Sequence, residues 1–298
     1  MEFFSDFWIT YGSVVQFVLI NMILAISIYF TLYTGLLSLA NAGFMAVGAY
    51  ISALLTIHTG MPFPLSLLLG ALAAALVGLL LGLPVLRLRD VYLAIATLGF
   101  GEIVRIFAVN FDNMTHLDLL GGAQGLAGVP KLTTPEGLIF TLLILCLLLI
   151  QLQRSRFGRA LVAIRSDESV ASSMGIDVFK HKVIAFVLGA FIAGLAGGFS
   201  AHLTRFVGPN DYGFNAAVNI LSFVVLGGTL HWSGALIGAA ILTILPEALR
   251  FMNEYRGVIN GVILVLVIIF MPQGLINPKW LAKFFRRKEA PDAGTQAG

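Results

Sequence analysis

The feature that most restricts the fold is a series of apolar segments, each close to the length that crosses a lipid bilayer. A membrane-spanning helix needs about twenty predominantly apolar residues. Such segments occur at residues 13–33, 35–57, 64–86, 91–111, 137–152 and 183–203, followed by a long apolar region at 218–249 and a last segment at 258–271. The series predicts an all-α integral membrane protein, a polytopic helical bundle of about eight to nine spans. We expect it to form a single transmembrane domain over residues 1–298.

Composition favours a helical membrane bundle over the soluble and β-barrel classes. The chain is 58% hydrophobic and 11% charged, whereas about a quarter of the residues in a soluble domain are charged. Its apolar segments are continuous, whereas transmembrane β-barrels are built from short segments of alternating polarity. The basic residues behind the net charge of +3 mostly flank the spans. The positive charge therefore does not indicate nucleic-acid binding.

The distribution of basic residues predicts the orientation, because Lys and Arg concentrate on the cytoplasmic side of membrane proteins. The basic regions are a short loop after residue 86, a polar segment at about 154–182 and a tail at about 277–298. Their basic residues are Arg87 and Arg89, then Arg154, Arg156, Arg159, Arg165, Lys180 and Lys182, and finally Lys279, Lys283, Arg286, Arg287 and Lys288. The loop at 112–136 is more acidic. We therefore expect the N-terminus outside and the C-terminus in the cytoplasm.

Two apolar regions, at 35–50 and 215–238, are interrupted by small and polar residues. For the long apolar region at 218–249 we favour a turn near 227–234 with a return across the membrane, because a single crossing would leave the basic tail outside. Re-entrant or short segments are tolerated where protein or a water-filled cavity covers their backbone. Interrupted segments are also a sequence signal for a transport path, although ordinary packing of small residues explains them equally well.

The polar segment at 154–182 has the signals of a compact helical module. Ser166 is a plausible helix N-cap, with acidic residues in the following first turn and Gly175 where a C-terminal cap belongs. Val170, Ala171 and Met174 form a short apolar stripe. A second short helix is expected upstream, over 159–165. The stripe is too small for a core, but it suits insertion into the groove of a partner protein.

A charged pair lies within the fourth predicted span. Glu102 and Arg105 are three residues apart and share a helix face, so the two side chains can pair. Charge at membrane depth is costly and usually faces the interior of the bundle. The pair is either a site that touches a polar or zwitterionic substrate or a structural ion pair that fixes packing.

The chain has no recognisable catalytic motif. It contains no G-x-x-x-x-G-K-[ST] loop for binding ATP phosphates, and its five His residues lack the spacing of metal ligands. Asp211 and Arg205 follow the sixth predicted span, where we expect a solvated surface. The chain is therefore not expected to be an enzyme or to bind a cofactor or metal.

Several motifs resemble one family. They are GLPVLRLRDVYLAIATLGFGEIVRI at 82–106, FGRALVAIRSDE at 157–168, GGAQGL at 121–126, VVLGG at 224–228 and MPQGL at 271–275. Together they resemble the permease subunits of branched-chain amino acid ABC importers, specifically the M-type subunit of the Liv system. Ala40 and Asn41 depart from the residues that relatives often carry. Because importers of urea and short amides share this architecture, they remain the alternative.

The resemblance implies a subunit of an ATP-driven importer in the bacterial inner membrane. Its partners would be an H-type permease, two cytoplasmic ATPases that bind ATP and Mg²⁺, and a periplasmic binding protein that delivers an amino acid. The segment at 154–182 would be the loop that couples to an ATPase. The expected coupling residues are Arg159, Arg165, Glu168, Ala171, Met174 and Gly175.

The translocation path is predicted from polar or small positions in the interrupted segments and the fourth span. The candidates are Ser38, Asn41, Phe44, Thr97, Glu102, Arg105 and Asn219. A stand-alone secondary transporter is the main rival function. It would need intramembrane carboxylates for ion coupling, and Glu102 has Arg105 ready to neutralise it.

Overall fold

A computed structural model describes residues 2–116, 119–228, 231–248 and 261. In this part of the chain the long helices are α1 (Glu2–Tyr33), α2 (Asn41–Thr59), α3 (Phe63–Val85), α4 (Asp90–Thr115), α5 (Pro135–Arg154) and α8 (Val178–Thr204), and each is long and apolar enough to cross a membrane. The shorter helices are α6 (Arg156–Ser166), α7 (Glu168–Ser173), α9 (Phe214–Gly227) and α10 (Trp232–Ala248). The prediction of an all-α polytopic bundle is confirmed. Apart from residue 261, the predicted span at 258–271 lies outside the described residues, as does the basic tail.

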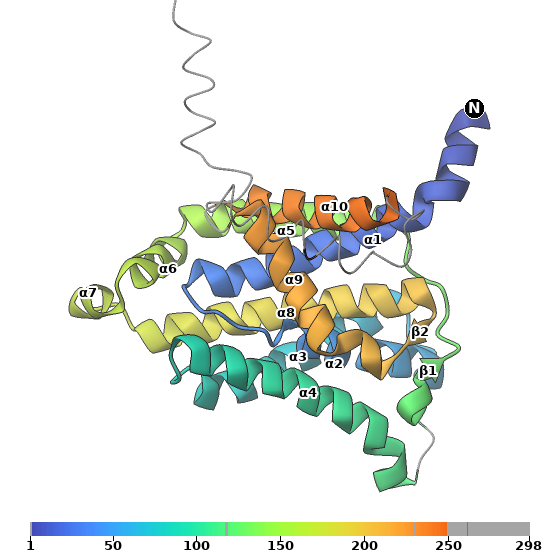
Figure 1. Cartoon of the computed structure of the whole chain (residues 1–298), viewed down its shortest axis with the longest axis horizontal. Helices are drawn as coiled ribbons and strands as arrows, with labels where there is room; N and C mark the ends of the chain where they lie inside the picture. Colours follow the sequence, from blue (N-terminus) through green and yellow to red (C-terminus); the bar gives the residue numbers. More distant parts are fainter. Residues whose placement is uncertain (1, 117–118, 229–230, 249–260, 262–298) are drawn as a thin grey trace, which may run out of the picture.

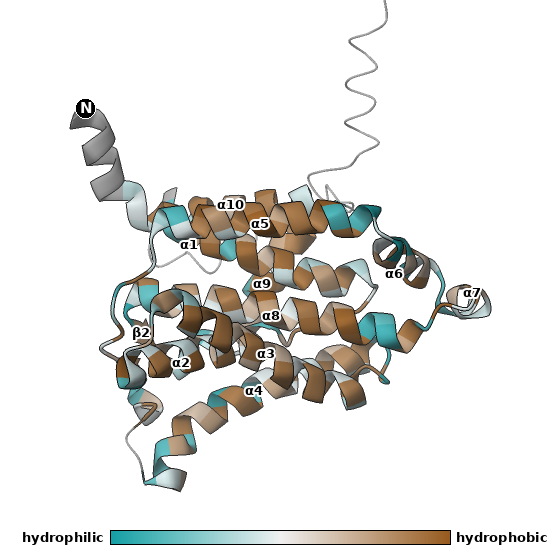
Figure 2. Ribbon diagram, turned by 180° about the vertical axis from the view of Figure 1, so that it is seen from behind, coloured by the Kyte–Doolittle hydropathy of each residue, from teal (hydrophilic) through white to brown (hydrophobic). Residues whose placement is uncertain are grey.

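Helix α8 lies at the centre of the bundle and packs against α1, α2 and α3 (Figure 1). Small residues make this packing close: Gly194 of α8 lies against Gly48 of α2, with no room for a Cβ atom at Gly48. Phe186 of α8 is fully buried and meets Phe44 edge to face, with 5.4 Å between ring centroids. Figure 2 shows hydrophobic residues along the bundle and hydrophilic ones where α5 joins α6.

The predicted span at 35–57 does not begin as a helix. Residues 36–39 are non-helical, and α2 starts only at Asn41. This turn is held by α4, because the backbone N–H of Leu39 donates a hydrogen bond to the Thr97 hydroxyl at 3.0 Å. This interaction satisfies a backbone donor that lipid would leave unpaired.

The apolar region at 218–249 forms the predicted hairpin. Helices α9 and α10 pack against each other, and their crossing is tightest where Gly227 and Gly234 bring the two backbones together. Gly228 follows α9 with φ of 101°, a conformation that favours glycine. Figure 1 shows α10 running back alongside α1.

At the opposite end from α6 and α7, two short strands join distant loops (Figure 1). Strand β1 (Leu126–Ala127) pairs antiparallel with β2 (Phe206–Val207). The glycine-rich run before β1 contains the 3₁₀ turn η1 (Gly122–Gln124) and is anchored by Asp112 of α4. The Asp112 carboxylate accepts hydrogen bonds from the backbone N–H groups of Leu119, Leu120 and Gly122.

Candidate functional site

Helices α6 and α7 form the module predicted from the polar segment, and they project from one end of the bundle (Figure 1). Ser155 caps α6 by accepting a hydrogen bond from the Gly158 N–H at 3.1 Å. Leu161 and Ile164 are buried on one face of α6, while Arg159 is exposed. The predicted helix at 159–165 is therefore confirmed within a longer helix.

The N-cap of α7 is Asp167, so the prediction of Ser166 as the cap was wrong. The Asp167 carboxylate accepts hydrogen bonds from the N–H groups of Ser169 and Val170, at 2.8 and 3.0 Å. Ser166 instead ends α6, where its hydroxyl donates to the Val162 carbonyl at 3.0 Å. The chain bends one residue later than expected because α6 retains Ser166.

The C-terminal cap of α7 is as predicted. Gly175 has φ of 81° and donates its N–H to the Ser172 carbonyl, while Ile176 donates to the Ala171 carbonyl. These two bonds form a Schellman motif, which ends a helix with a left-handed glycine. Gly175 therefore has a defined structural role in the module.

The predicted apolar stripe of α7 divides between two faces. Val170 and Met174 are 56% and 76% exposed, one helical turn apart. Ala171 is 1% exposed, so it packs inward, and its assignment to an exposed docking stripe was wrong. The apolar surface that α7 and its C-terminal end offer to a partner is formed by Val170 and Met174.

Two contacts join the module to the bundle. The Lys182 ammonium near the start of α8 pairs with the Glu168 carboxylate at the start of α7; the Lys182 side chain is 9% exposed and that of Glu168 is 49% exposed. Arg165 lies against Gly35 in the turn between α1 and α2. Sequence reasoning missed this role of Lys182, although a lysine directly at the boundary of an apolar span is itself a signal of a paired charge.

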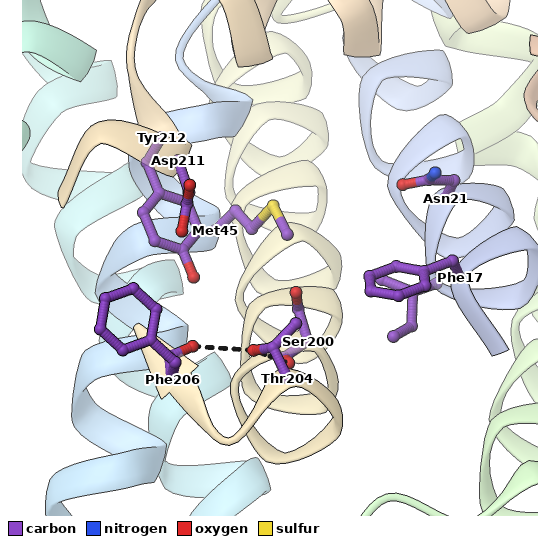
Figure 3. A pocket seen from close by; sticks show the side chains of 9 residues that line it. Phe17, Asn21, Met45, Ser200, Thr204, Phe206, Asp211 and Tyr212 are labelled. Atoms are coloured by element: carbon purple, nitrogen blue, oxygen red, sulfur yellow. Dashed lines mark hydrogen bonds between the residues drawn. The ribbon is translucent and has the colours of Figure 1, made fainter. Parts of the chain in front are cut away.

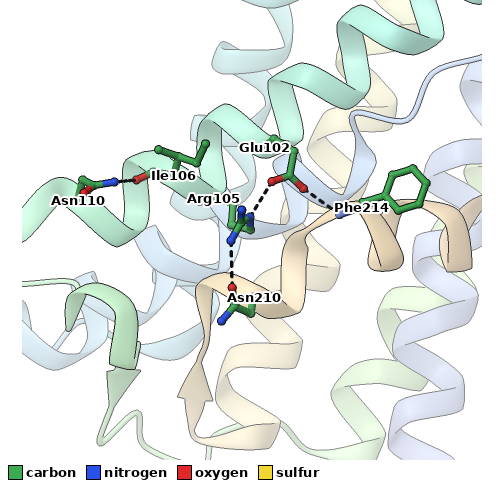
Figure 4. Close-up of polar contacts among 6 residues, drawn as sticks. All are labelled: Glu102, Arg105, Ile106, Asn110, Asn210 and Phe214. Atoms are coloured by element: carbon green, nitrogen blue, oxygen red, sulfur yellow. Dashed lines mark hydrogen bonds and ion pairs between the residues drawn. The ribbon is translucent and has the colours of Figure 1, made fainter.

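The predicted pair on α4 is an ion pair: Arg105 Nε donates to Glu102 Oε2 at 2.7 Å (Figure 4). Both side chains are about a third exposed, at 32% and 31%. Glu102 Oε1 also accepts from the Phe214 N–H at 3.1 Å, and Arg105 Nη1 donates to Asn210 Oδ1 at 3.1 Å. The pair therefore joins α4 to the start of α9, a role that was not predicted.

Four of the predicted path residues gather around the start of α2. Ser38, Asn41, Phe44 and Thr97 are all buried. Asn41 donates a hydrogen bond to Ser27 of α1, and its side-chain carbonyl oxygen has no partner. Phe44 lies between Phe186 and Phe100, with 5.2 Å between its ring centroid and that of Phe100. Asn219 is exposed on α9 and is not part of this group.

A cavity of about 320 Å³ opens at the end of the bundle that carries β1 and β2 (Figure 3). Its walls come from α1, α2, α8, β2 and the 3₁₀ turn η2 (Pro209–Tyr212). The lining residues are Phe17, Ile20, Asn21, Met45, Ser200, Thr204, Phe206, Asp211 and Tyr212. The sequence placed Asp211 on a solvated surface; it is exposed, but it lies at this cavity.

The described residues contain no group of three or more His, Cys, Asp or Glu side chains that could hold a metal ion. His202 is fully buried and hydrogen-bonds to the Pro130 carbonyl through Nδ1 at 3.0 Å, with Ser52 near its other nitrogen. These contacts give His202 a structural position between α2, α8 and the segment before α5.

Comparison with known proteins identifies the family. The family described as branched-chain amino acid transport system / permease component matches residues 10–268. The chain belongs to this family. The matched region includes the projecting module, the Glu102–Arg105 pair and the cavity.

The chain is similar to the LivM proteins of Salmonella typhimurium strain LT2 and Escherichia coli strain K12. Both are named high-affinity branched-chain amino acid transport system permease proteins. Each is 37% identical over 82% of this chain and 64% of the relative. The chain thus spans slightly less than two thirds of the length of these relatives. LivH of the same Salmonella strain is 33% identical over 58% of this chain and 60% of its own length. No solved structure matches the chain.

Proposed function

We propose that this chain is the membrane-spanning permease subunit of an ATP-binding-cassette importer that carries branched-chain amino acids. The observation that carries the proposal is the capped helix α7, held at the end of an apolar bundle with Val170 and Met174 exposed. An exposed apolar pair on a helix that projects from a membrane bundle is suited to a groove on a partner protein. The family match extends through this helix.

The proposed partners are a second, H-type permease, two cytoplasmic ATPases and a periplasmic binding protein. ATP and Mg²⁺ would bind to the ATPases, and this chain would not be catalytic. We propose that the chain is oriented with α6 and α7 facing the cytoplasm and the β1–β2 end facing outside. The complex would lie in the bacterial inner membrane, with the N-terminus outside and the C-terminus in the cytoplasm.

Coupling would proceed from α7 into the bundle. When the ATPases close on ATP, they would draw α7 with them through Val170 and Met174, and Arg159, which is exposed on α6, would contribute to the contact. The Glu168–Lys182 pair and the contact of Arg165 with Gly35 would transmit the motion to α8 and to the turn before α2. Because α8 packs against α1, α2 and α3, its movement would open the path in turn to the outside and to the cytoplasm.

The path would run along α4 and α9 and past the start of α2. Glu102, Arg105 and Asn219 are accessible on α4 and α9, and polar groups at membrane depth face protein or water rather than lipid. Ser38, Asn41, Phe44 and Thr97 lie at the start of α2 and would line the path when the bundle opens.

The test is purification from native cells in mild detergent, followed by reconstitution into liposomes. Recovery of an ATPase and a second permease, with leucine uptake that requires ATP and the binding protein, would support the proposal. Excess valine should compete with leucine, whereas urea should not. Recovery of this chain alone, active in uptake driven by an ion gradient, would contradict it.

A further inference from the structure

The cavity at the β1–β2 end has the size and the mixed lining of a small-molecule site. Its volume of about 320 Å³ lies within the range of known ligand pockets, roughly 300–1,000 Å³. Phe17 and Ile20 of α1, Met45 of α2 and Phe206 of β2 supply apolar contacts. The remaining lining residues are polar, and Figure 3 shows them on the α8 and η2 sides with Asn21 across from them.

The described lining of the cavity carries a negative charge and no positive one. Asp211 is the acidic residue of the lining, and none of the described lining residues is Lys or Arg. The ion pairs in the described part of the chain are Arg105–Glu102 and Lys182–Glu168, so the Asp211 carboxylate has no cation there. Burial raises the pKa of the neighbouring Tyr212 phenol, which therefore stays neutral.

The other polar groups provide neutral hydrogen-bonding capacity. Ser200 and Thr204 lie one turn apart on α8 and face the same cavity. The Thr204 hydroxyl donates to the Phe206 carbonyl at 2.7 Å, which leaves its oxygen free to accept. Asn21 donates one amide hydrogen to Thr243 of α10 at 2.9 Å and retains a second.

We propose that this cavity binds an amino acid with an apolar side chain, whose ammonium group is held by the Asp211 carboxylate. The apolar side chain would contact Phe17, Met45 and Phe206, and the ligand carboxylate would meet neutral donors such as the Asn21 amide. Because the ammonium would meet an opposite full charge, whereas the carboxylate would meet only neutral donors, the ammonium contributes more than the carboxylate. The inference rests on the proposed function and assigns its outer substrate site.

A site of this kind would bind its ligand weakly, which suits transport. Lacking a cation for the carboxylate, it would hold an incoming amino acid less tightly than a site that neutralises both charges. Release into the path would therefore be fast. In the proposed orientation the cavity faces outside, where the binding protein would deliver its ligand.

The experiment uses the purified importer in liposomes and photo-leucine, a leucine analogue that carries a diazirine. After irradiation, labelled peptides are mapped by mass spectrometry in the presence of leucine, isoamylamine or isocaproate. Isoamylamine retains the ammonium group of leucine without its carboxylate. Isocaproate retains the carboxylate without the ammonium group. We expect label at Phe17, Met45 or Phe206, suppressed by leucine and by the amine, with the acid at least about tenfold less effective.

Variants separate binding from folding. Asp211→Asn should lower labelling about tenfold and Asp211→Glu should largely retain it, while Glu136→Gln, which removes an exposed carboxylate at the same end, should leave it unchanged. Label elsewhere in the chain, equal competition by amine and acid, or full labelling of Asp211→Asn would each overturn the proposal. Absence of ATP-driven leucine uptake by the unaltered importer would instead reject the proposed function.

Discussion

Lys182 of α8 forms an ion pair with Glu168 at the first position of α7, across the turn that joins the two helices. The lysine is nearly buried and the glutamate is half exposed. A buried ammonium needs a partner, because removing it from water without one is costly. The pair therefore holds the projecting helix in a fixed position on the central helix of the bundle.

The first prediction concerns this pair. Glu168→Gln should lower ATP-driven uptake about tenfold, a loss equal to one charge-assisted hydrogen bond, because α7 no longer moves with α8. Membrane insertion should be retained. Uptake and ATP hydrolysis are measured together, since loss of coupling lowers the number of substrates carried per ATP.

The control for this prediction exchanges the two charges. Glu168→Lys combined with Lys182→Glu should recover part of the lost coupling, whereas each single reversal should be worse than Glu168→Gln. A charge exchange no better than the single reversals would show that the pair does not transmit the motion.

The second prediction places the docking surface on Val170 and Met174. Met174→Asp puts a charge into an apolar contact, so binding of the ATPase should fall at least about tenfold while insertion remains intact. Ser172→Asp is the matched control, because Ser172 is exposed elsewhere on the same short helix. Co-purification of the ATPase gives the measurement, and equal binding by the two variants would exclude docking through Met174.

The third prediction concerns Glu102 and Arg105. Removing one charge leaves the other unpaired at membrane depth, so Glu102→Gln and Arg105→Gln should each impair expression and uptake more than the double variant. Gln at position 102 still accepts a hydrogen bond from the Phe214 N–H. Arg105→Gln should therefore be at least as harmful as Glu102→Gln. Additive losses in the double variant would count against pairing in the membrane.

The fourth prediction concerns orientation. In a chain with Cys146→Ser, a cysteine at the exposed Lys131 should react with a membrane-impermeant maleimide added to intact spheroplasts, and one at Ser169 of α7 should not. Permeabilised cells serve as the control, in which both positions should react. The opposite pattern in intact spheroplasts would invert the proposed topology and place the cavity on the cytoplasmic side.

Local sequence patterns predicted much of the fold. The six long spans follow from continuous apolar runs, because a helix pairs all of its own backbone polar groups in lipid. Gly175 could be recognised as a helix terminus because a left-handed C-terminal residue is a local requirement. The hairpin at 218–249 was predicted by combining charge counts with the glycines at 227–234.

The candidate site was predictable only in part. The spacing of Glu102 and Arg105 indicated their pairing, but the bond to Phe214 depends on α9 returning to α4. The choice of Asp167 over Ser166 as the cap depended on how far α6 extends, and two adjacent good cap formers do not decide that. Ala171 is buried because of its neighbours, which the short apolar stripe could not show.

By itself, the sequence determined which segments are helices in the membrane and where a polar helical module lies between them. Those properties depend on hydrophobicity, spacing and capping within a few neighbouring residues. Only the tertiary structure decided that Lys182 pairs with Glu168 and that Asp211 lies at a cavity with Asn21 and Met45. The physical reason is that these contacts join residues on different elements, whose relative positions depend on packing across the whole bundle, such as that of small residues between α2, α3 and α8.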